Sequence, residues 1–127
     1  MAHGLSNYLC NAILDAVGNN TSLAVAVPYV KLHVGDPGAA GTALPAIETT
    51  RKSISFSVAA AGAIVSDADI SWTNIAGSQD ATHFTVWDNL TAGNFLFSGA
   101  ITAGAYTAGD TYTITAGNLS ASLTVAS

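Results

Sequence analysis

Two histidine–aspartate pairs are the residues of this sequence whose types and spacing could do chemistry. His33 precedes Asp36 by three positions, and His83 precedes Asp88 by five. A histidine oriented by a carboxylate can act as a general base toward a hydroxyl, and serine and threonine are abundant here. No serine, however, lies in the Gly-x-Ser-x-Gly pattern that exposes a nucleophile at a strand-to-helix turn. We therefore expect no enzyme, and we interpret both histidines as surface or interface residues on the outward side of their strands.

Metal and cofactor binding have equally little support in the sequence. Asp67 and Asp69 alternate along a predicted strand and could share a hard cation such as Ca²⁺, but no further acidic ligand lies close by in the sequence. Three histidines and the single cysteine, Cys10, show no zinc-binding spacing. The turn Gly35–Gly38 lacks the lysine and the glycine spacing of a phosphate-binding loop. We predict neither a metal nor a cofactor.

The two tryptophans, Trp72 and Trp87, suggest a third chemistry, the stacking of sugar rings. Trp87 should face opposite to Phe84 and Val86, so we expect it to be exposed or covered by the helix or by another subunit. Sugar-binding sites usually need several aromatic residues with polar neighbours, and no such cluster is visible. Packing is the commoner role of an isolated tryptophan.

The composition excludes several classes of protein. The 127 residues are 50% hydrophobic but only 9% charged, and alanine alone fills 24 positions. No run approaches the roughly 18 to 20 apolar residues that a membrane-spanning helix needs. Lys31, Arg51 and Lys52 are the only basic residues against eight acidic ones, which gives a net charge of −5. Because phosphate binding requires clustered basic residues, we expect no nucleic acid as partner, and the lack of a membrane-spanning run leads us to expect no membrane.

A helix is the first of the elements that must position these residues. Apolar residues recur at every fourth position near the N-terminus, namely Leu5, Leu9, Ile13 and Val17. Gly4 or Ser6 could cap the start of the helix, and Gly18 could end it. Residues 1–20 are therefore predicted to form a helical segment that packs on its own domain or on a neighbour.

Alternating apolar and polar residues after Pro28 predict a series of short strands. These strands lie near residues 29–34, 53–58, 64, 70–72, 83–87, 95–101, 112–114 and 119–125, and 53–58 alternates most cleanly. With turn residues between them, the seven or eight strands predict a mainly β fold over residues 1–127, an antiparallel β-sandwich or small barrel with one short N-terminal α-helix. We favour the sandwich as a single domain. Residues 35–50 have no period and predict a long loop of the kind that serves binding or assembly.

Several stretches resemble a family of small structural proteins of tailed bacteriophages, especially those of Actinobacteria, whose members are labelled tail fibre or minor virion structural proteins. They are Tyr29–Gly38, Glu48–Arg51, Ser71–Trp72, Thr82–Asp88, Ala92–Leu96, Ser98–Ile101, Ala108–Thr111, Asn7–Leu9 and Ala12–Asp15. The resemblance covers nearly the whole chain. It implies a non-enzymatic component of the virion, made in the bacterial cytoplasm, with no catalytic residues to transfer.

A weakly charged surface of small residues favours close subunit packing, because little side-chain entropy or desolvation opposes it. We expect a homo-oligomer, with a trimer favoured, that decorates the capsid and stabilises its lattice by binding the major capsid protein. The alternative is a tail or tail-fibre protein that binds tail proteins and contacts the host surface, and a second alternative is a carbohydrate-binding module. The candidate interface residues are Leu5, Leu9, Ile13, Asp36, Pro37, Glu48, Arg51 and Trp87.

Overall fold

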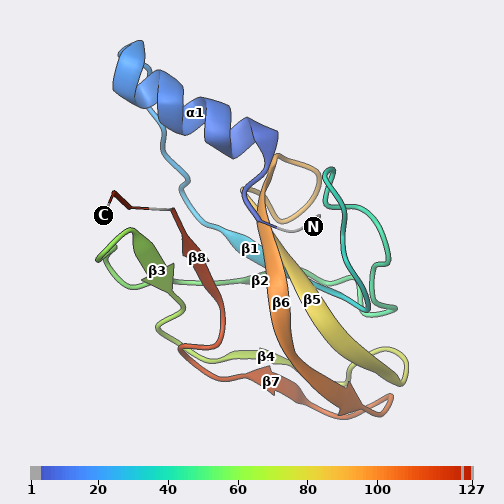
Figure 1. The fold of residues 1–127 in the computed structure, drawn as a ribbon. Coiled ribbons are helices and arrows are strands. Elements are labelled where there is room, and N and C mark those ends of the chain that lie inside the picture. Colours follow the sequence, from blue (N-terminus) through green and yellow to red (C-terminus); the bar gives the residue numbers. More distant parts are fainter. Residues whose placement is uncertain (1–3, 124, 127) are drawn as a thin grey trace.

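The computed structural model describes residues 4–123, 125 and 126, and its first element is the predicted helix (Figure 1). Helix α1 spans Asn7–Gly18. The Ser6 side chain caps it by accepting a hydrogen bond from the Leu9 N–H at 3.0 Å. The Asn19 N–H donates to the Asp15 carbonyl at the other end. The prediction of a short N-terminal helix is confirmed.

Eight strands follow among the described residues, and all their pairings are antiparallel. They are β1 (Tyr29–His33), β2 (Lys52–Ser53), β3 (Ala63–Val65), β4 (Ile70–Trp72), β5 (Gln79–Trp87), β6 (Phe95–Tyr106), β7 (Tyr112–Ile114) and β8 (Ser120–Ser122). Four of them form one sheet in the order β2-β1-β5-β6, while β3–β8 and β4–β7 form two-stranded ribbons. The predicted mainly β, antiparallel fold is confirmed, with the second layer divided into two ribbons.

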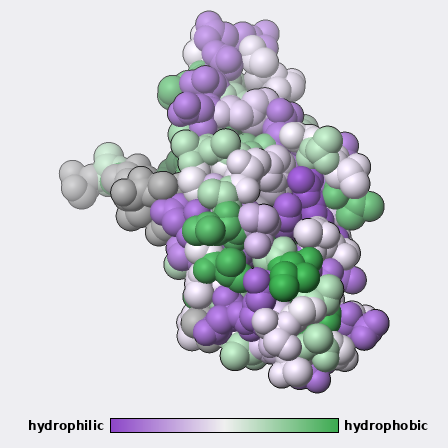
Figure 2. Space-filling view, turned by 90° about the vertical axis from the view of Figure 1, so that its right-hand side faces the viewer, coloured by the Kyte–Doolittle hydropathy of each residue, from purple (hydrophilic) through white to green (hydrophobic). Residues whose placement is uncertain are grey.

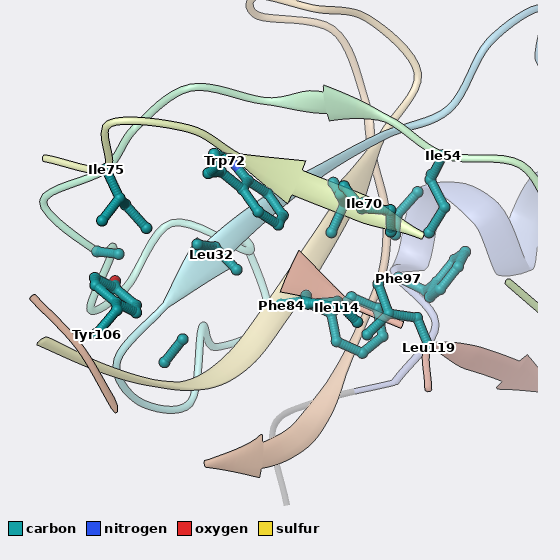
Figure 3. Close-up of a cluster of buried hydrophobic side chains, with 14 of the residues drawn as sticks. Leu32, Ile54, Ile70, Trp72, Ile75, Phe84, Phe97, Tyr106, Ile114 and Leu119 are labelled. Carbon is teal, nitrogen blue, oxygen red and sulfur yellow. The ribbon is translucent and has the colours of Figure 1, made fainter. Parts of the chain in front are cut away.

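The hydrophobic core lies between the four-stranded sheet and the ribbons. The register of β1 and β5 pairs Val30 with Val86 and Leu32 with Phe84, so these four side chains share one face of the sheet. Figure 3 shows Leu32 and Phe84 meeting side chains from across the core, including Ile70, Trp72, Ile114 and Leu119. Burial of these large apolar groups supplies the main driving force for folding.

The prediction of a regular strand over residues 53–58, the segment that alternates most cleanly, is wrong. The Ile54 N–H still donates to the Pro28 carbonyl, but beyond that point β1 has no residues left to pair with, and proline has no N–H to offer. Phe56 then forms one isolated bridge with Ser66, and Val58 is 92% exposed. Of the last predicted strand, 119–125, residue 124 lies outside the described residues, and among the described ones Ser120–Ser122 form β8 and pair with β3.

No helix among the residues that the structure describes has both the length and the apolar character needed to cross a membrane.

Candidate functional site

Segment 35–51 covers the face of the sheet that points away from the core. We call this surface, together with the β5–β6 turn at residues 88–94, the loop face. The segment contains neither a helix nor a paired strand, as predicted for residues 35–50. Figure 2 looks onto the side that carries it and shows hydrophobic groups gathered between hydrophilic ones. Leu44 and Ile47, both from this segment, are each 57% exposed.

Backbone pairing fixes the middle of the segment to β1. The Val34 N–H donates to the Leu44 carbonyl at 2.9 Å, and the Ala46 N–H donates to the Leu32 carbonyl at 3.1 Å. Residues 44–46 thus continue the edge that β2 covers further along β1. The loop is held to the sheet by the same kind of hydrogen bond that holds its strands together.

A buried chain of hydrogen bonds lies beneath the loop face. His33 Nδ1 lies 2.8 Å from the Ala43 carbonyl oxygen, and its Nε2 lies 2.9 Å from Thr85 Oγ1. Trp87 Nε1 donates to the same hydroxyl at 2.8 Å. Because a carbonyl only accepts, Nδ1 must carry the proton of a neutral ring, and Thr85 donates its own proton to Nε2. In this arrangement each polar side-chain atom of His33, Thr85 and Trp87 has a hydrogen-bond partner, and His33 is neutral.

His33 is therefore a buried residue, and its prediction as a surface or interface residue is wrong. Its exposure is 0%, although it does lie on the outward side of β1 as expected. Segment 35–51 covers that side. Burial lowers the pKa of His33, and the nearby charges of Lys31 and His83 lower it further, while backbone hydrogen bonds oppose the shift in part.

Trp87 is covered by its own chain, so the expectation that it is exposed or covered by the helix or by another subunit is also wrong. The side chain is 8% exposed. The Arg51 guanidinium carbon lies 4.3 Å from the centroid of the indole, a cation–π contact, and the Phe95 ring lies 5.5 Å away. Arg51 Nη1 also donates to the Asn89 carbonyl at 2.8 Å and to the Ala92 carbonyl at 2.7 Å. One arginine thus ties the loop to the β5–β6 turn.

Glu48 anchors the other side of the loop. Its carboxylate accepts hydrogen bonds from the backbone N–H groups of Ala76, at 2.9 Å, and Thr50, at 3.3 Å. Burial by itself would raise the pKa of Glu48, but these hydrogen bonds and the charge of Lys52 outweigh it, so the net pKa is lowered. Trp72 Nε1 adds a further link by donating to the Thr50 carbonyl at 2.9 Å.

The predicted interface residues fall into two separate places. Three of them, Pro37, Glu48 and Trp87, are nearly buried in the loop face and contact other residues of the same chain. Asp36 accepts a hydrogen bond from the Gly38 N–H at 3.0 Å and shapes the turn there, while Arg51 makes the contacts described above. The helix residues lie elsewhere: Leu5, Leu9 and Ile13 line an apolar groove of about 220 Å³ beside β3 and β8.

The remaining sequence candidates do not assemble into a chemical site. Asp67 accepts a hydrogen bond from the Ser55 hydroxyl, and Asp69 accepts one from the Ala116 N–H at 2.9 Å. Among the residues that the structure describes, no group of three or more histidine, cysteine, aspartate or glutamate side chains could hold a metal ion. Trp72 is 1% exposed in the core, so neither tryptophan offers an open face for a sugar ring.

Thr85 is the residue at this site that reasoning from the sequence missed. It sits at the centre of the buried chain, where it pairs with both His33 and Trp87. Its neighbours in the network come from β1 and from the same strand two residues on. The feature that could have pointed to Thr85 is its position: its small, uncharged hydroxyl side chain pairs with Lys31 across the strands and lies beside the outward-facing rings of His33 and Trp87.

Comparison with known proteins adds one positive finding. No curated protein matches the chain. The model of a protein family described as Podophage GP4 fiber I protein gp80 matches residues 4–122. The match covers nearly the whole length and confirms the resemblance to tail-fibre and structural proteins of phages. The chain therefore belongs to the Podophage GP4 fiber I protein gp80 family.

Proposed function

We propose that this chain is a non-enzymatic structural protein of a phage tail fibre, and that its loop face is a preformed contact surface. The observation that carries the proposal is the family match over residues 4–122, which supports a phage structural protein and favours the tail-fibre alternative over capsid decoration. The geometry of the loop face supports the second part, since its links are structural and none has the arrangement of a catalytic group.

The loop face is suited to binding because it is held in place before any partner arrives. Four hydrogen bonds hold the loop to different parts of the domain. They join Ala43 to His33 on β1, Glu48 to the backbone of Ala76, Thr50 to Trp72 on β4, and Arg51 to the β5–β6 turn at Asn89. A surface that is already ordered loses less conformational entropy on binding, which leaves more of the contact energy as affinity. Its exposed apolar side chains, Leu44 and Ile47, are the natural contact points for the host surface or a neighbouring tail protein.

Immunogold electron microscopy of virions with an antibody against this chain tests the location. We expect label at the tail, and a density map should show few copies there. Label distributed over the head, with hundreds of copies in a lattice, would overturn the tail-fibre proposal and restore capsid decoration. Release of fragments from purified host cell walls by the isolated protein would overturn the non-enzymatic part.

A substitution separates the role of the loop face from the location. Ile47→Glu places a charge on an exposed side chain and should leave folding intact, while adsorption of the virions to host cells falls. Thr111→Glu, at an exposed position outside the loop face, is the matched control and should adsorb normally. If both variants adsorb like the wild type, the loop face is not the contact surface.

A further inference from the structure

Lys31 and Arg51 place two positive charges next to each other on the outward side of the four-stranded sheet. The register of β1 and β2 pairs Val30 with Lys52, and the next step of this register sets Lys31 opposite Arg51. Val30 is buried in the core, so the alternation of the strand points Lys31 to the outward side, where its partner on β5 is Thr85. The Lys31 side chain is half-buried there and can reach solvent.

This pair of like charges is unfavourable for the fold. Like charges directly opposite each other on paired strands repel, and among the described residues no carboxylate forms an ion pair with either side chain. Partial burial lowers the pKa of Lys31, and the charge of Arg51 lowers it further. The charge of Asp88 acts on Arg51, but both oxygens of that carboxylate accept hydrogen bonds from Asn94, at 2.7 and 2.9 Å. A bound anion would remove the repulsion.

Arg51 keeps hydrogen-bond donors for such an anion. Its Nη1 donates to the carbonyls of Asn89 and Ala92, whereas its Nε and Nη2 have no hydrogen-bond partner among the described residues. The Lys31 ammonium has none there either. The two carbonyls and the indole of Trp87 hold the guanidinium in place, so its remaining donors are oriented before a ligand arrives.

The number of charges favours a phosphate group as the ligand. A phosphate ester carries about 1.5 to 2 negative charges at neutral pH and three acceptor oxygens, so it can pair with both cations at once. A carboxylate carries one charge and would leave one cation uncompensated. A nucleic acid fits less well, because Lys52, the third basic residue of the chain, lies opposite the core residue Val30 and does not extend the pair into a row.

We propose that Lys31 and Arg51 form a binding site at the rim of the loop face for a single phosphate group, of the kind that a phosphorylated surface glycan carries. The phosphate oxygens accept hydrogen bonds from the free side of the guanidinium and pair with the ammonium. The proposal deepens the proposed function and rests on it, since it names the chemistry that the loop face takes from the host. Exposed charge pairs are weak, so we expect a dissociation constant of about 1 mM for one site.

Nuclear magnetic resonance of protein labelled with carbon-13 in its lysine side chains tests the site directly. The chain has two lysines, Lys31 and Lys52, so the second signal is an internal control. Titration with glucose 1-phosphate at constant ionic strength should shift the Lys31 signal and raise the pKa of Lys31, because a bound anion stabilises the charged ammonium. The Lys52 signal should stay in place. A Lys31 signal that does not respond would overturn the proposal.

Substitutions separate a binding role of Lys31 from a structural one. Glucose 1-phosphate at about ten times the dissociation constant should raise the urea midpoint of the wild type, and Lys31→Met should abolish this rise. Without ligand, Lys31→Met should raise the midpoint, because it removes the repulsion from Arg51. Lys31→Arg keeps the charge and should keep the response to the ligand. Lys52→Met, the matched control, loses the same charge elsewhere and should respond like the wild type. A full response in Lys31→Met would refute the site.

Comparison of ligands identifies the source of the phosphate. Inorganic phosphate and glucose 1-phosphate should both bind, glucuronate should bind more weakly, and glucose should not bind. Binding of inorganic phosphate without glucose 1-phosphate would overturn the glycan assignment, and tighter binding of glucuronate would overturn the choice of phosphate. If no phosphate binds while Ile47→Glu virions still adsorb poorly, the loop face keeps its contact role and the phosphate site alone is refuted.

Discussion

Replacing Thr85 with valine removes one hydroxyl from beneath the loop face while keeping the shape of the side chain. That hydroxyl accepts a hydrogen bond from Trp87 Nε1 at 2.8 Å and donates one to His33 Nε2 at 2.9 Å. Without it, two nearly buried polar atoms lose their partner. Each costs about 1–3 kcal/mol, so we expect the free energy of unfolding to fall by about 2–6 kcal/mol. Since domains of this size are stable by about 5–15 kcal/mol, the loss should be easily measured.

Urea unfolding followed by tryptophan fluorescence measures this loss. Thr113→Val is the matched control, because Thr113 makes a similar hydroxyl contact, 2.8 Å from Ser71 Oγ, but on the exposed side of β7. Water can replace that contact, so the control should lose less than about 1 kcal/mol. If Thr85→Val costs no more than Thr113→Val, the buried network contributes no net stability and our account of how the loop is held is wrong.

Three further outcomes follow from the same structure. The pKa of His33 is lowered in the folded state, so below about pH 6.5 the unfolded state binds a proton that the folded state does not, and the free energy of unfolding should fall by at most about 1.4 kcal/mol per pH unit. Glu48, whose pKa is also lowered, should extend this loss below about pH 4.5. A free energy of unfolding, measured in urea, that stays constant across this pH range would contradict both expectations. Tyr106→Phe should leave thermal stability unchanged or slightly raised, because the buried Tyr106 hydroxyl has no hydrogen-bond partner among the described residues; a drop of several degrees would refute this. Gly41→Ala should cost about 1–3 kcal/mol in urea unfolding, since Gly41 has a φ of +73° and a Cβ there would lie 2.7 Å from the Phe95 ring; an unchanged midpoint would show that the ring moves freely.

Local signals in the sequence were sufficient for the helix and most of the strands. Ser6 marks the start of α1 through its capping side chain, and the helix ends at Gly18 with Asn19 as the C-cap and Asn20 at a left-handed φ of 52°. The apolar stripe needs no information from elsewhere in the chain. The strand expected at residues 53–58 failed for the opposite reason. A strand needs a partner of matching length, and whether β1 continues past Pro28 cannot be read from the alternation of the strand that would pair with it.

The loop face shows why the candidate site was only partly predictable. Alternation correctly placed His33 and Trp87 on the outward side of their strands, but it cannot tell whether that side faces water. The cover comes from Ala43, Arg51 and Phe95, which are 8 to 36 positions away from the residues they cover. Only the three-dimensional path of the loop brings these groups together.

The edges of the four-stranded sheet bear on how copies of this protein behave when crowded. On one side, β2 is only two residues long and residues 44–46 cover the rest of β1. On the other side, the backbone of Gly4–Ser6 covers the rim of β6 at its first residues, with Ser6 N–H donating to the Leu96 carbonyl and Ser98 N–H donating to the Gly4 carbonyl, each at 2.8 Å. A sheet with blunted rims offers few free backbone groups for another sheet to add to. At these covered positions, a second copy would meet side chains and paired backbone rather than free backbone groups of the sheet.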